Sequence, residues 1–211
     1  MEFIDAAIQD YAEQFSSPEP DLLLKLAEET RANIPVPQML SGHLQGRLLS
    51  LFSRMLRPKQ ILEVGTYTGY ASLCMAEGLQ KDGKLHTIDI NADLKQMLER
   101  YIRLAGMENN IVPHTGDALQ VIPKLEGPFD LVFLDAHKPE YCDYFDLVID
   151  KVPSGGLIIA DNVLWSGHVL EPNPDEDTKG LMRYVQKIRD DDRVFQVLLP
   201  IRDGLMLARK K

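Results

Sequence analysis

The chain has only two cysteines, Cys74 and Cys142, among its 211 residues. So few cysteines exclude a disulfide scaffold, and we expect two reduced thiols in a cytoplasmic protein. No apolar run approaches the length of a membrane-spanning helix. The N-terminal stretch MEFIDAAIQD has neither a basic start nor a long apolar core. These absences predict a protein with no membrane partner and no secretory signal.

Basic residues are also scarce, since 23 Lys and Arg face 32 Asp and Glu, for a formal net charge of −9. Nucleic acids and anionic membranes are bound through clustered basic residues, so neither is an expected partner. Residues 1–24 and 166–178 contain no Lys or Arg. That absence disfavours a coenzyme A ester and a tRNA as substrates, because their phosphates require cations at the site.

The length and the hydrophobic content of 45% predict one domain over residues 1–211. Helical patterns at 1–15, 21–33 and 42–57 precede the first strong strand, so we interpret 1–57 as cap helices on a core over 58–211. Strands are predicted at 61–64, 84–89, 111–114, 129–134 and 156–160, and helices at about 69–79, 92–105, 117–125, 138–150 and 178–190. This alternation predicts a mostly parallel sheet covered on both faces. Residues 194–199 and 205–209 flank Asp203-Gly204 and predict a closing β-hairpin.

The stretch from Ile61 to Tyr70 organises this pattern, because an apolar run breaks at Gly65 and an amphipathic segment follows. It predicts a strand that passes through a tight turn into a helix, with a ligand beyond the end of the strand. The spacing of Gly65 and Gly69 is G-x-x-x-G, so the dinucleotide pattern G-x-G-x-x-G is absent. Glu63 makes this edge acidic, which suits a cationic or hydroxyl-rich ligand. An ordinary strand-to-helix turn remains the alternative.

Acidic residues also follow the second and third predicted strands. Asp89 follows Gly65 at close to the roughly 20 residues typical of a carboxylate that binds a ribose. The alternative is a helix cap, for which Asn91 serves equally well. We interpret Asp117 chiefly as the cap of the next helix, with ligand contact as a second role.

The fourth and fifth predicted strands end in Asp135 and in Asp161-Asn162. If these strands are neighbours, their ends lie about 5 Å apart, and three oxygen ligands share one rim. Hard cations such as Mg²⁺ and Ca²⁺ prefer such a set. A lone strand-end Asp is more often a cap, but two with an Asn on adjacent strands indicate a cation site.

These motifs resemble those of the cation-dependent O-methyltransferases, which include catechol and caffeoyl-CoA O-methyltransferases and many bacterial relatives. The similarity runs from about Met39 to Gly204, in the same order and spacing. The motifs that carry it are Glu63-Val64-Gly65-Thr66-Tyr67-Thr68-Gly69-Tyr70, Ile88-Asp89, Gly116-Asp117-Ala118, Phe133-Leu134-Asp135-Ala136-His137-Lys138 and Asp161-Asn162-Val163-Leu164-Trp165. The resemblance implies a Rossmann-like class I methyltransferase fold, with a seven-stranded sheet of order 3-2-1-4-5-7-6. It also implies a homodimer.

Position by position, the resemblance implies that S-adenosylmethionine contacts Ser41, Gly42, Glu63, Gly65, Thr66, Tyr67, Ser72, Asp89, Asp117, Ala118 and Asp135. Relatives usually have Ser directly after Gly-Tyr, whereas this chain has Ala71 and then Ser72. The resemblance further implies a divalent metal on Asp135, Asp161 and Asn162, either Mg²⁺ or Ca²⁺ with Mn²⁺ as a further option. Lys138 matches the general base, and Asp135 is expected to take part in catalysis with it.

The implied reaction is methyl transfer to a vicinal-dihydroxy, catechol-like phenolic small molecule that contacts Lys138, Asn162 and Trp165. Trp165 is interpreted as a flat wall for the aromatic ring or as a core residue that anchors its loop. We interpret His137 as a residue behind the site or on the surface. The other histidines have no partner spacing and are interpreted as structural: His43, His86, His114 and His168.

Three alternatives remain open beside this function. A methyltransferase of the same fold could modify an RNA hydroxyl, although the acidic balance opposes it. An NAD(P)-dependent Rossmann oxidoreductase is opposed by the missing glycine motif and by the terminal hairpin. A non-catalytic protein that binds S-adenosylmethionine is opposed by the intact set of Asp135, Lys138, Asp161 and Asn162.

Overall fold

The computed structural model describes residues 4–211. The helix predicted at 1–15 is observed as α1 over Ala6–Gln14, and residues 1–3 lie outside the described part. The other helices are α2 Asp21–Asn33, α3 Gly42–Leu56, α4 Tyr70–Ala76, α5 Lys95–Leu104, α6 Ala118–Val121, α7 Tyr141–Val148 and α8 Glu176–Asp190. The strands are β1 Gln60–Val64, β2 Lys84–Asp89, β3 Ile111–Thr115, β4 Leu131–Leu134, β5 Leu157–Ala160, β6 Val194–Leu199 and β7 Leu205–Lys210.

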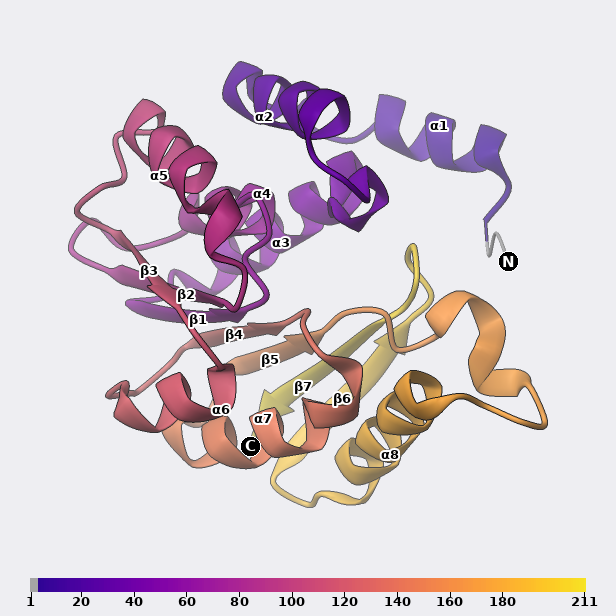
Figure 1. Cartoon of the computed structure of the whole chain (residues 1–211). Helices are drawn as coiled ribbons and strands as arrows, with labels where there is room; N and C mark the ends of the chain where they lie inside the picture. The colour runs from indigo at the N-terminus through magenta and orange to yellow at the C-terminus, as the bar shows by residue number, and fades with distance from the viewer. Residues whose placement is uncertain (1–3) are drawn as a thin grey trace.

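One seven-stranded sheet crosses the molecule in the order β3-β2-β1-β4-β5-β7-β6 (Figure 1). Strands β1 to β5 run parallel, and β7 pairs antiparallel with both β5 and β6. The predicted order and the closing hairpin are both confirmed. The order reverses between β1 and β4, and in open α/β sheets such a reversal marks the ligand-binding edge.

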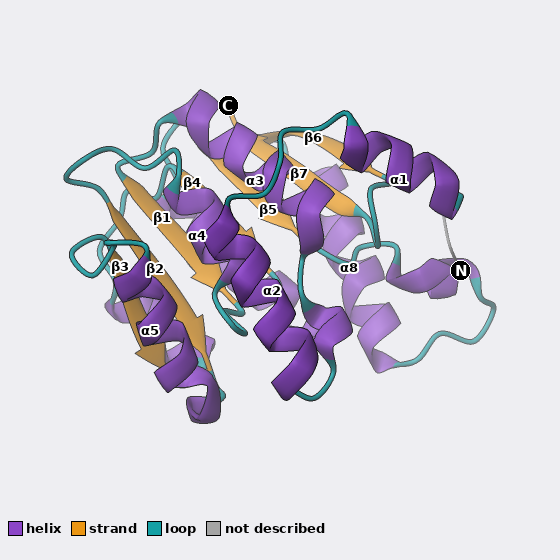
Figure 2. Cartoon of the chain, turned by 90° about the horizontal axis from the view of Figure 1, so that it is seen from above, coloured by secondary structure: helices purple, strands orange, loops and turns teal. Residues whose placement is uncertain are grey.

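Helices cover both faces of the sheet, as the alternation predicts. In Figure 1, α2, α3, α4 and α5 lie above the sheet and α6, α7 and α8 lie below it, and Figure 2 shows the upper helices over the strands. Each face has its own buried cluster. Leu26, Leu49 and Ile61 belong to the upper one, and Val132 and Tyr184 belong to the lower one. The strands between the two clusters are therefore buried on both sides.

Several predicted helices are divided in the structure by 3₁₀ turns. The helix predicted at 117–125 consists of α6 and a turn over Ile122–Lys124, where Pro123 has no N–H for a helical bond. The helix predicted at 138–150 consists of a turn at Lys138–Glu140, α7 and a turn at Ile149–Lys151. The one predicted at 92–105 begins as a turn over Ala92–Leu94 before α5. Two further turns were not predicted, Pro37–Met39 and Trp165–Leu170.

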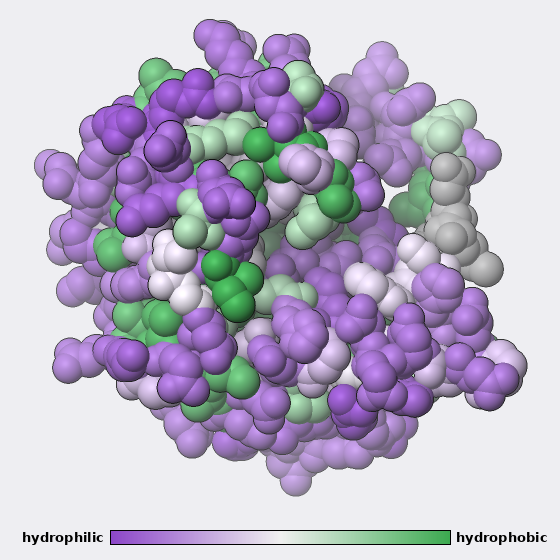
Figure 3. All heavy atoms as spheres, in the orientation of Figure 1, coloured by the Kyte–Doolittle hydropathy of each residue, from purple (hydrophilic) through white to green (hydrophobic). Residues whose placement is uncertain are grey.

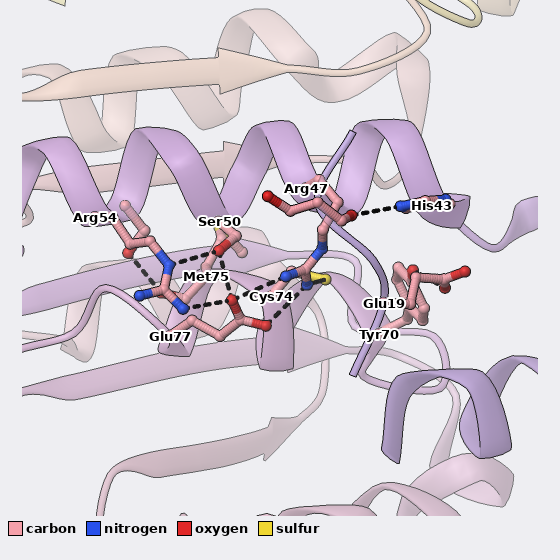
Figure 4. Close-up of polar contacts among 11 residues, drawn as sticks. Glu19, His43, Arg47, Ser50, Arg54, Tyr70, Cys74, Met75 and Glu77 are labelled. Atoms are coloured by element: carbon pink, nitrogen blue, oxygen red, sulfur yellow. Dashed lines mark hydrogen bonds and ion pairs between the residues drawn. The ribbon is translucent and has the colours of Figure 1, made fainter. Parts of the chain in front are cut away.

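Helix α3, the last of the cap helices, is joined to the core by a partly buried charged cluster. Figure 4 shows Arg47, Ser50 and Arg54 of α3 pointing toward Glu77 at the end of α4. The two guanidinium nitrogens of Arg47 donate to Glu77 at 2.8 and 3.0 Å, and Ser50 donates at 2.6 Å. Burial alone would raise the pKa of Glu77, but the hydrogen bonds from Arg47, Ser50 and Arg54 lower it. These contacts attach α3 firmly to α4.

The surface agrees with the acidic composition. On the face shown in Figure 3, hydrophilic residues predominate and hydrophobic ones form small separate groups. Among residues 4–211, no helix is both long enough and apolar enough to cross a membrane.

Candidate active site

The ends of β1 and β4 meet at Gly65, directly after β1. Gly65 has φ +100°, and a Cβ there would lie 1.9 Å from the backbone oxygen of Asp135. The Asp135 N–H donates to the Val64 carbonyl at 2.7 Å. Only glycine permits this approach, so the turn after β1 and the acid after β4 lie side by side, as the sequence predicts.

Glu63, the second-last residue of β1, is fully buried. Its Oε2 accepts hydrogen bonds from Ser72 and Thr87, while its Oε1 has no hydrogen-bond partner among residues 4–211. Burial raises the pKa of Glu63 to about 8, although both hydroxyl donors act in the opposite direction. A buried oxygen without a partner is costly unless a ligand supplies a donor. This oxygen therefore fits the positively charged amino group of S-adenosylmethionine.

Ser72, the expected substitute for a serine at position 71, is fully buried and donates its hydroxyl to Glu63. The position after Gly-Tyr is taken by Ala71, which has no donor. Ser72 therefore orients Glu63 in the structure, and its direct contact with a cofactor stays a prediction.

Asp89 holds the turn that follows β1. Its Oδ2 accepts from the Tyr67 N–H at 2.7 Å, and its Oδ1 accepts from the Asn91 N–H at 2.8 Å. The capping alternative belongs to Asn91, whose side chain accepts from the Asp93 N–H at 2.9 Å. Asp89 thus lies at the end of β2 beside the Gly65 turn, where the predicted ribose contact requires it.

The remaining expected cofactor residues make local contacts within the protein. Asp117 caps α6 by accepting from the Leu119 N–H at 2.9 Å, which confirms its capping role. Buried Thr66 pairs with Thr87 beneath the turn. Ser41 is buried directly before α3, and its carbonyl accepts from Arg202. Ligand contacts of these residues, and of Gly42 and Ala118, stay predictions.

The three predicted cation ligands lie together around Lys138. Its Nζ donates to Asp135 Oδ1 at 2.9 Å and to Asn162 Oδ1 at 2.6 Å. Two oxygens from neighbouring strand ends therefore converge on one positively charged atom. Lys138 is itself 8% exposed, so this contact is shielded from water.

Asp161, the third predicted cation ligand, is buried. It is 2% exposed, with Oδ2 accepting from Gln45 Nε2 at 2.6 Å and Oδ1 from the Asn162 N–H at 2.7 Å. Burial raises the pKa of Asp161, and the nearby Asp135 carboxylate raises it further. Two carboxylates in such proximity are stabilised by a cation between them.

The donor set consists of two carboxylates and one amide oxygen at the ends of the adjacent strands β4 and β5, the type of ligand that hard divalent cations prefer. Within the described chain, no three His, Cys, Asp or Glu side chains form a metal cluster, so the set depends on the Asn162 amide. Asn162 has φ 62°, a conformation that asparagine tolerates better than most residues. Such backbone conformations gather at functional sites.

Trp165 lies beside the oxygen set. The Lys138 Nζ is 5.6 Å from the centroid of its ring, and the ring also packs against the lower core. The packing against the core agrees with the anchoring interpretation of Trp165, whereas its contact with an aromatic substrate stays a prediction. The left-handed backbone of Trp165, Ser166 and Gly167 makes the sharp bend that presents the ring.

The sequence analysis missed four residues of this site. Tyr141 is fully buried, and its hydroxyl lies 3.0 Å from Lys138 Nζ. Gln45 contacts Asp161, Asp203 contacts Asn162, and Arg202 contacts Gln45, all from distant parts of the chain. The only sequence signal was the position of Tyr141 three residues after Lys138, which a helical turn brings to the same side.

The four histidines interpreted as structural make local contacts that their spacing did not indicate. His86 Nδ1 and His114 Nε2 lie 3.0 Å apart across β2 and β3, and burial lowers the pKa of both. His43 contacts the Ser17 carbonyl, and His168 contacts Glu171. His137 has a side chain 61% exposed, so the surface interpretation is the correct one.

Comparison with known proteins identifies the family. The family model described as O-methyltransferase matches residues 13–211. The chain belongs to the O-methyltransferase family. The predicted class, an S-adenosylmethionine-dependent O-methyltransferase, is thereby confirmed, and the oxidoreductase alternative is removed. The predicted homodimer and cytoplasmic location stay predictions.

This O-methyltransferase is similar in sequence to enzymes of plants and bacteria. It is 33% identical over 206 residues to caffeoyl-CoA O-methyltransferase 5 of Nicotiana tabacum, covering 91% of this chain and 85% of that protein. It is 32% identical over 212 residues to catechol O-methyltransferase of Niastella koreensis, covering 96% of each.

Solved structures agree with the fold. The O-methyltransferase TomG from Streptomyces achromogenes, in complex with S-adenosylmethionine, superposes with a TM-score of 0.90 at 29% identity, covering 97% of this chain and 96% of that one. A Podospora anserina methyltransferase bound to S-adenosylhomocysteine also gives 0.90, at 28% identity, covering 97% and 94%.

Proposed function

We propose that this O-methyltransferase transfers a methyl group from S-adenosylmethionine to one hydroxyl of a vicinal-dihydroxy aromatic small molecule, with a divalent cation on Asp135, Asp161 and Asn162. The observation that carries the proposal is the convergence of Asp135 Oδ1 and Asn162 Oδ1 on the Nζ of Lys138. This arrangement supports an oxygen-lined cation site with a proton acceptor at its centre. When bound, the cation supplies positive charge that favours the ionised form of a hydroxyl group.

Lys138 is the proposed general base. In its neutral form its Nζ accepts the proton of the reacting hydroxyl as the oxygen attacks the methyl carbon and the sulfonium leaves as a thioether. Two further neighbours orient Lys138: the Tyr141 hydroxyl at 3.0 Å and the face of the Trp165 ring. The base is thereby kept beside the oxygen set, where aligned reaction partners are most effective.

The Gly65 turn supports the cofactor half of the site. The Oε1 of Glu63, which has no partner among residues 4–211, is the proposed acceptor for the amino group of S-adenosylmethionine. Asp89 at the end of β2, which also accepts from the Tyr67 N–H, is the proposed acceptor for the ribose hydroxyls. The relatives whose names include S-adenosylmethionine or S-adenosylhomocysteine superpose over nearly the whole chain, which supports the same cofactor here.

A catechol-like substrate is favoured over a coenzyme A ester. One group of relatives is named for caffeoyl-CoA and another for catechol. The caffeoyl group and catechol both carry two vicinal hydroxyls on an aromatic ring. Residues 166–178, which follow Trp165, contain no Lys or Arg for the phosphates of coenzyme A. Arg202 directs its guanidinium to the Ser41 and Gln45 oxygens, so it is engaged within the protein.

A substrate screen with labelled S-adenosylmethionine and Mg²⁺ tests this function. Catechol and caffeic acid should accept the methyl group, whereas phenol and 4-hydroxycinnamic acid, each one hydroxyl short, should accept little. Caffeoyl-CoA should be no better than caffeic acid. Equal rates with the single-hydroxyl compounds would contradict the proposed chelation, and a strong preference for the coenzyme A ester would contradict the substrate class.

A further inference from the structure

The loop between β6 and β7 packs against the segment that follows β5. The Val163 N–H donates to the Gly204 carbonyl at 3.1 Å, and the Leu164 N–H donates to the Asp203 carbonyl at 2.9 Å. A Cβ at Gly204 would lie 2.5 Å from the Leu164 side chain, so glycine is needed for this approach. The hairpin loop is therefore fixed, backbone to backbone, beside Asn162.

The side chain of Asp203 lies on the NH₂ side of the Asn162 amide. Asp203 Oδ2 lies 3.4 Å from Asn162 Nδ2, and its Oδ1 accepts from the Ser166 N–H. Both oxygens of Asp203 accept from N–H groups, one of which is the NH₂ group of the Asn162 amide. The amide oxygen then points the opposite way, toward Lys138 and Asp135.

The neighbouring Arg202 contacts Gln45, which in turn binds Asp161, the other proposed ligand after β5. The Arg202 guanidinium donates to the Ser41 carbonyl and lies 3.5 Å from Gln45 Oε1. The amide of Gln45 is thereby oriented with its Nε2 toward Asp161 Oδ2, at 2.6 Å. Gln45 is fully buried, so no water competes for this amide.

Arg202 has φ 49°, a left-handed conformation that is unfavourable for a residue other than glycine. Glycine would remove this cost, and Gly204 stands two residues further on in the same loop. A side chain kept at a strained position indicates that its contacts matter.

We propose that Arg202 and Asp203 are positioning residues of the cation site: Arg202 acts through Gln45 on Asp161, and Asp203 acts directly on Asn162. The hairpin loop thus aligns both ligands that follow β5. The proposal rests on the cation site put forward above. Partners behind metal ligands usually change metal affinity by about 10- to 100-fold when removed.

The test is Mn²⁺ affinity, measured by electron paramagnetic resonance on the purified full chain without substrate or cofactor. The variant is Arg202→Gly, which removes the guanidinium and relieves the strained backbone. Arg57→Gly is the matched control, because Arg57 also has φ 49° and ends α3 far from the oxygen set in sequence. Thermal melting of each protein reports folding independently. Arg202→Lys and Asp203→Ala are the second variants.

We expect Arg202→Gly to bind Mn²⁺ about 10-fold or more weakly, with a melting temperature equal to or above that of the wild type. The Mn²⁺ affinity of Arg202→Lys should lie between those of Arg202→Gly and the wild type. Asp203→Ala should also bind Mn²⁺ more weakly than the wild type, and Arg57→Gly should match the wild type. Wild-type affinity in a folded Arg202→Gly protein would overturn the positioning role, as would an equal loss in Arg57→Gly. Failure of the wild type to bind Mn²⁺ would instead overturn the cation site itself, and this proposal with it.

Discussion

The Nζ of Lys138 lies 2.6 Å from Oδ1 of Asn162, so the proposed base shares a hydrogen bond with a proposed cation ligand. The same nitrogen donates to Asp135. An ammonium group and a divalent cation are therefore drawn to the same oxygens. The base and the cation site are coupled electrostatically, and changes at Lys138 should alter both catalysis and cation binding.

Substitution of Lys138 should remove the proton acceptor. Lys138→Ala is expected to lower kcat by about 10²–10⁴-fold while leaving S-adenosylhomocysteine affinity nearly unchanged. Raising the pH should partly restore the rate, because solvent can then deprotonate the hydroxyl. Steady-state kinetics across pH measures this, with Lys187→Ala, a surface ion pair to Asp146, as control. A loss of only a few-fold, without rescue at high pH, would make Lys138 a positioning residue.

The same site should bind cations more tightly without its ammonium group. Lys138→Met keeps most of the side-chain volume but frees two oxygens and removes a positive charge. Two unit charges at 4 Å interact by about 4 kcal/mol near a protein surface, and tenfold in affinity requires only about 1.4 kcal/mol, so Mn²⁺ affinity should rise by at least about tenfold. Isothermal titration with MnCl₂ measures it. Weaker binding in Lys138→Met would show that the lysine holds the ligands in place rather than competing for them.

Cofactor binding should release a proton from Glu63. Its pKa rises from an ordinary 4.5 to about 8 on folding, so Glu63 is mostly protonated at neutral pH. Because folding raises this pKa, the protonated Glu63 contributes to the free energy of unfolding. That contribution is complete below pH 4.5 and is lost as the pH rises through 8. A cationic amino group beside Oε1 favours the ionised form. Titration of S-adenosylhomocysteine at pH 7 in buffers of different ionisation enthalpy should therefore detect up to one proton released.

The control for this measurement is Glu63→Gln, which retains the shape but has no proton to lose. It should bind the cofactor more weakly, and its binding enthalpy should not depend on the buffer through this group. Buffer-independent binding by the wild type at pH 7 would mean that Glu63 does not meet the amino group.

The cluster around Glu77 should contribute strongly to stability. Glu77→Ala leaves the buried Arg47 guanidinium without its partner, so we expect a loss of about 2–4 kcal/mol in the free energy of unfolding. The lowered pKa of Glu77 means that this contribution exists above pH 4.5 and fades as the pH falls below it. Urea unfolding at pH 7 and pH 4 measures both effects. Glu176→Ala, at an exposed ion pair, should change little, and an equal loss there would contradict the account.

Local patterns were sufficient for most of the fold. The apolar run ending at Gly65 and the strand ends at Asp135 and Asp161 follow from periodicity and turn chemistry, which depend on neighbouring residues. The proposed cation ligands could be inferred as well, since the carboxyl ends of parallel strands meet at one edge. The sheet order depended on the resemblance to a known family.

The supporting residues could not be predicted, because their contacts join distant parts of the chain. Gln45 meets Asp161 from 116 positions away, and Arg202 meets Ser41 from 161 positions away. Each pairing depends on how α3 and the hairpin loop pack on the finished sheet, and no local spacing encodes it. The pairing of His86 with His114 was missed for the same reason, since it depends on the β2–β3 register.

The central claim is that oxygen ligands on Asp135, Asp161 and Asn162 bind a divalent cation required for methyl transfer to a vicinal diol. The most direct test is methylation of catechol by the full-length protein, with labelled S-adenosylmethionine, after removal of metal by EDTA. The account predicts that activity disappears in EDTA and returns to different degrees with excess Mg²⁺, Mn²⁺ or Ca²⁺. Full activity in the presence of the chelator would contradict it.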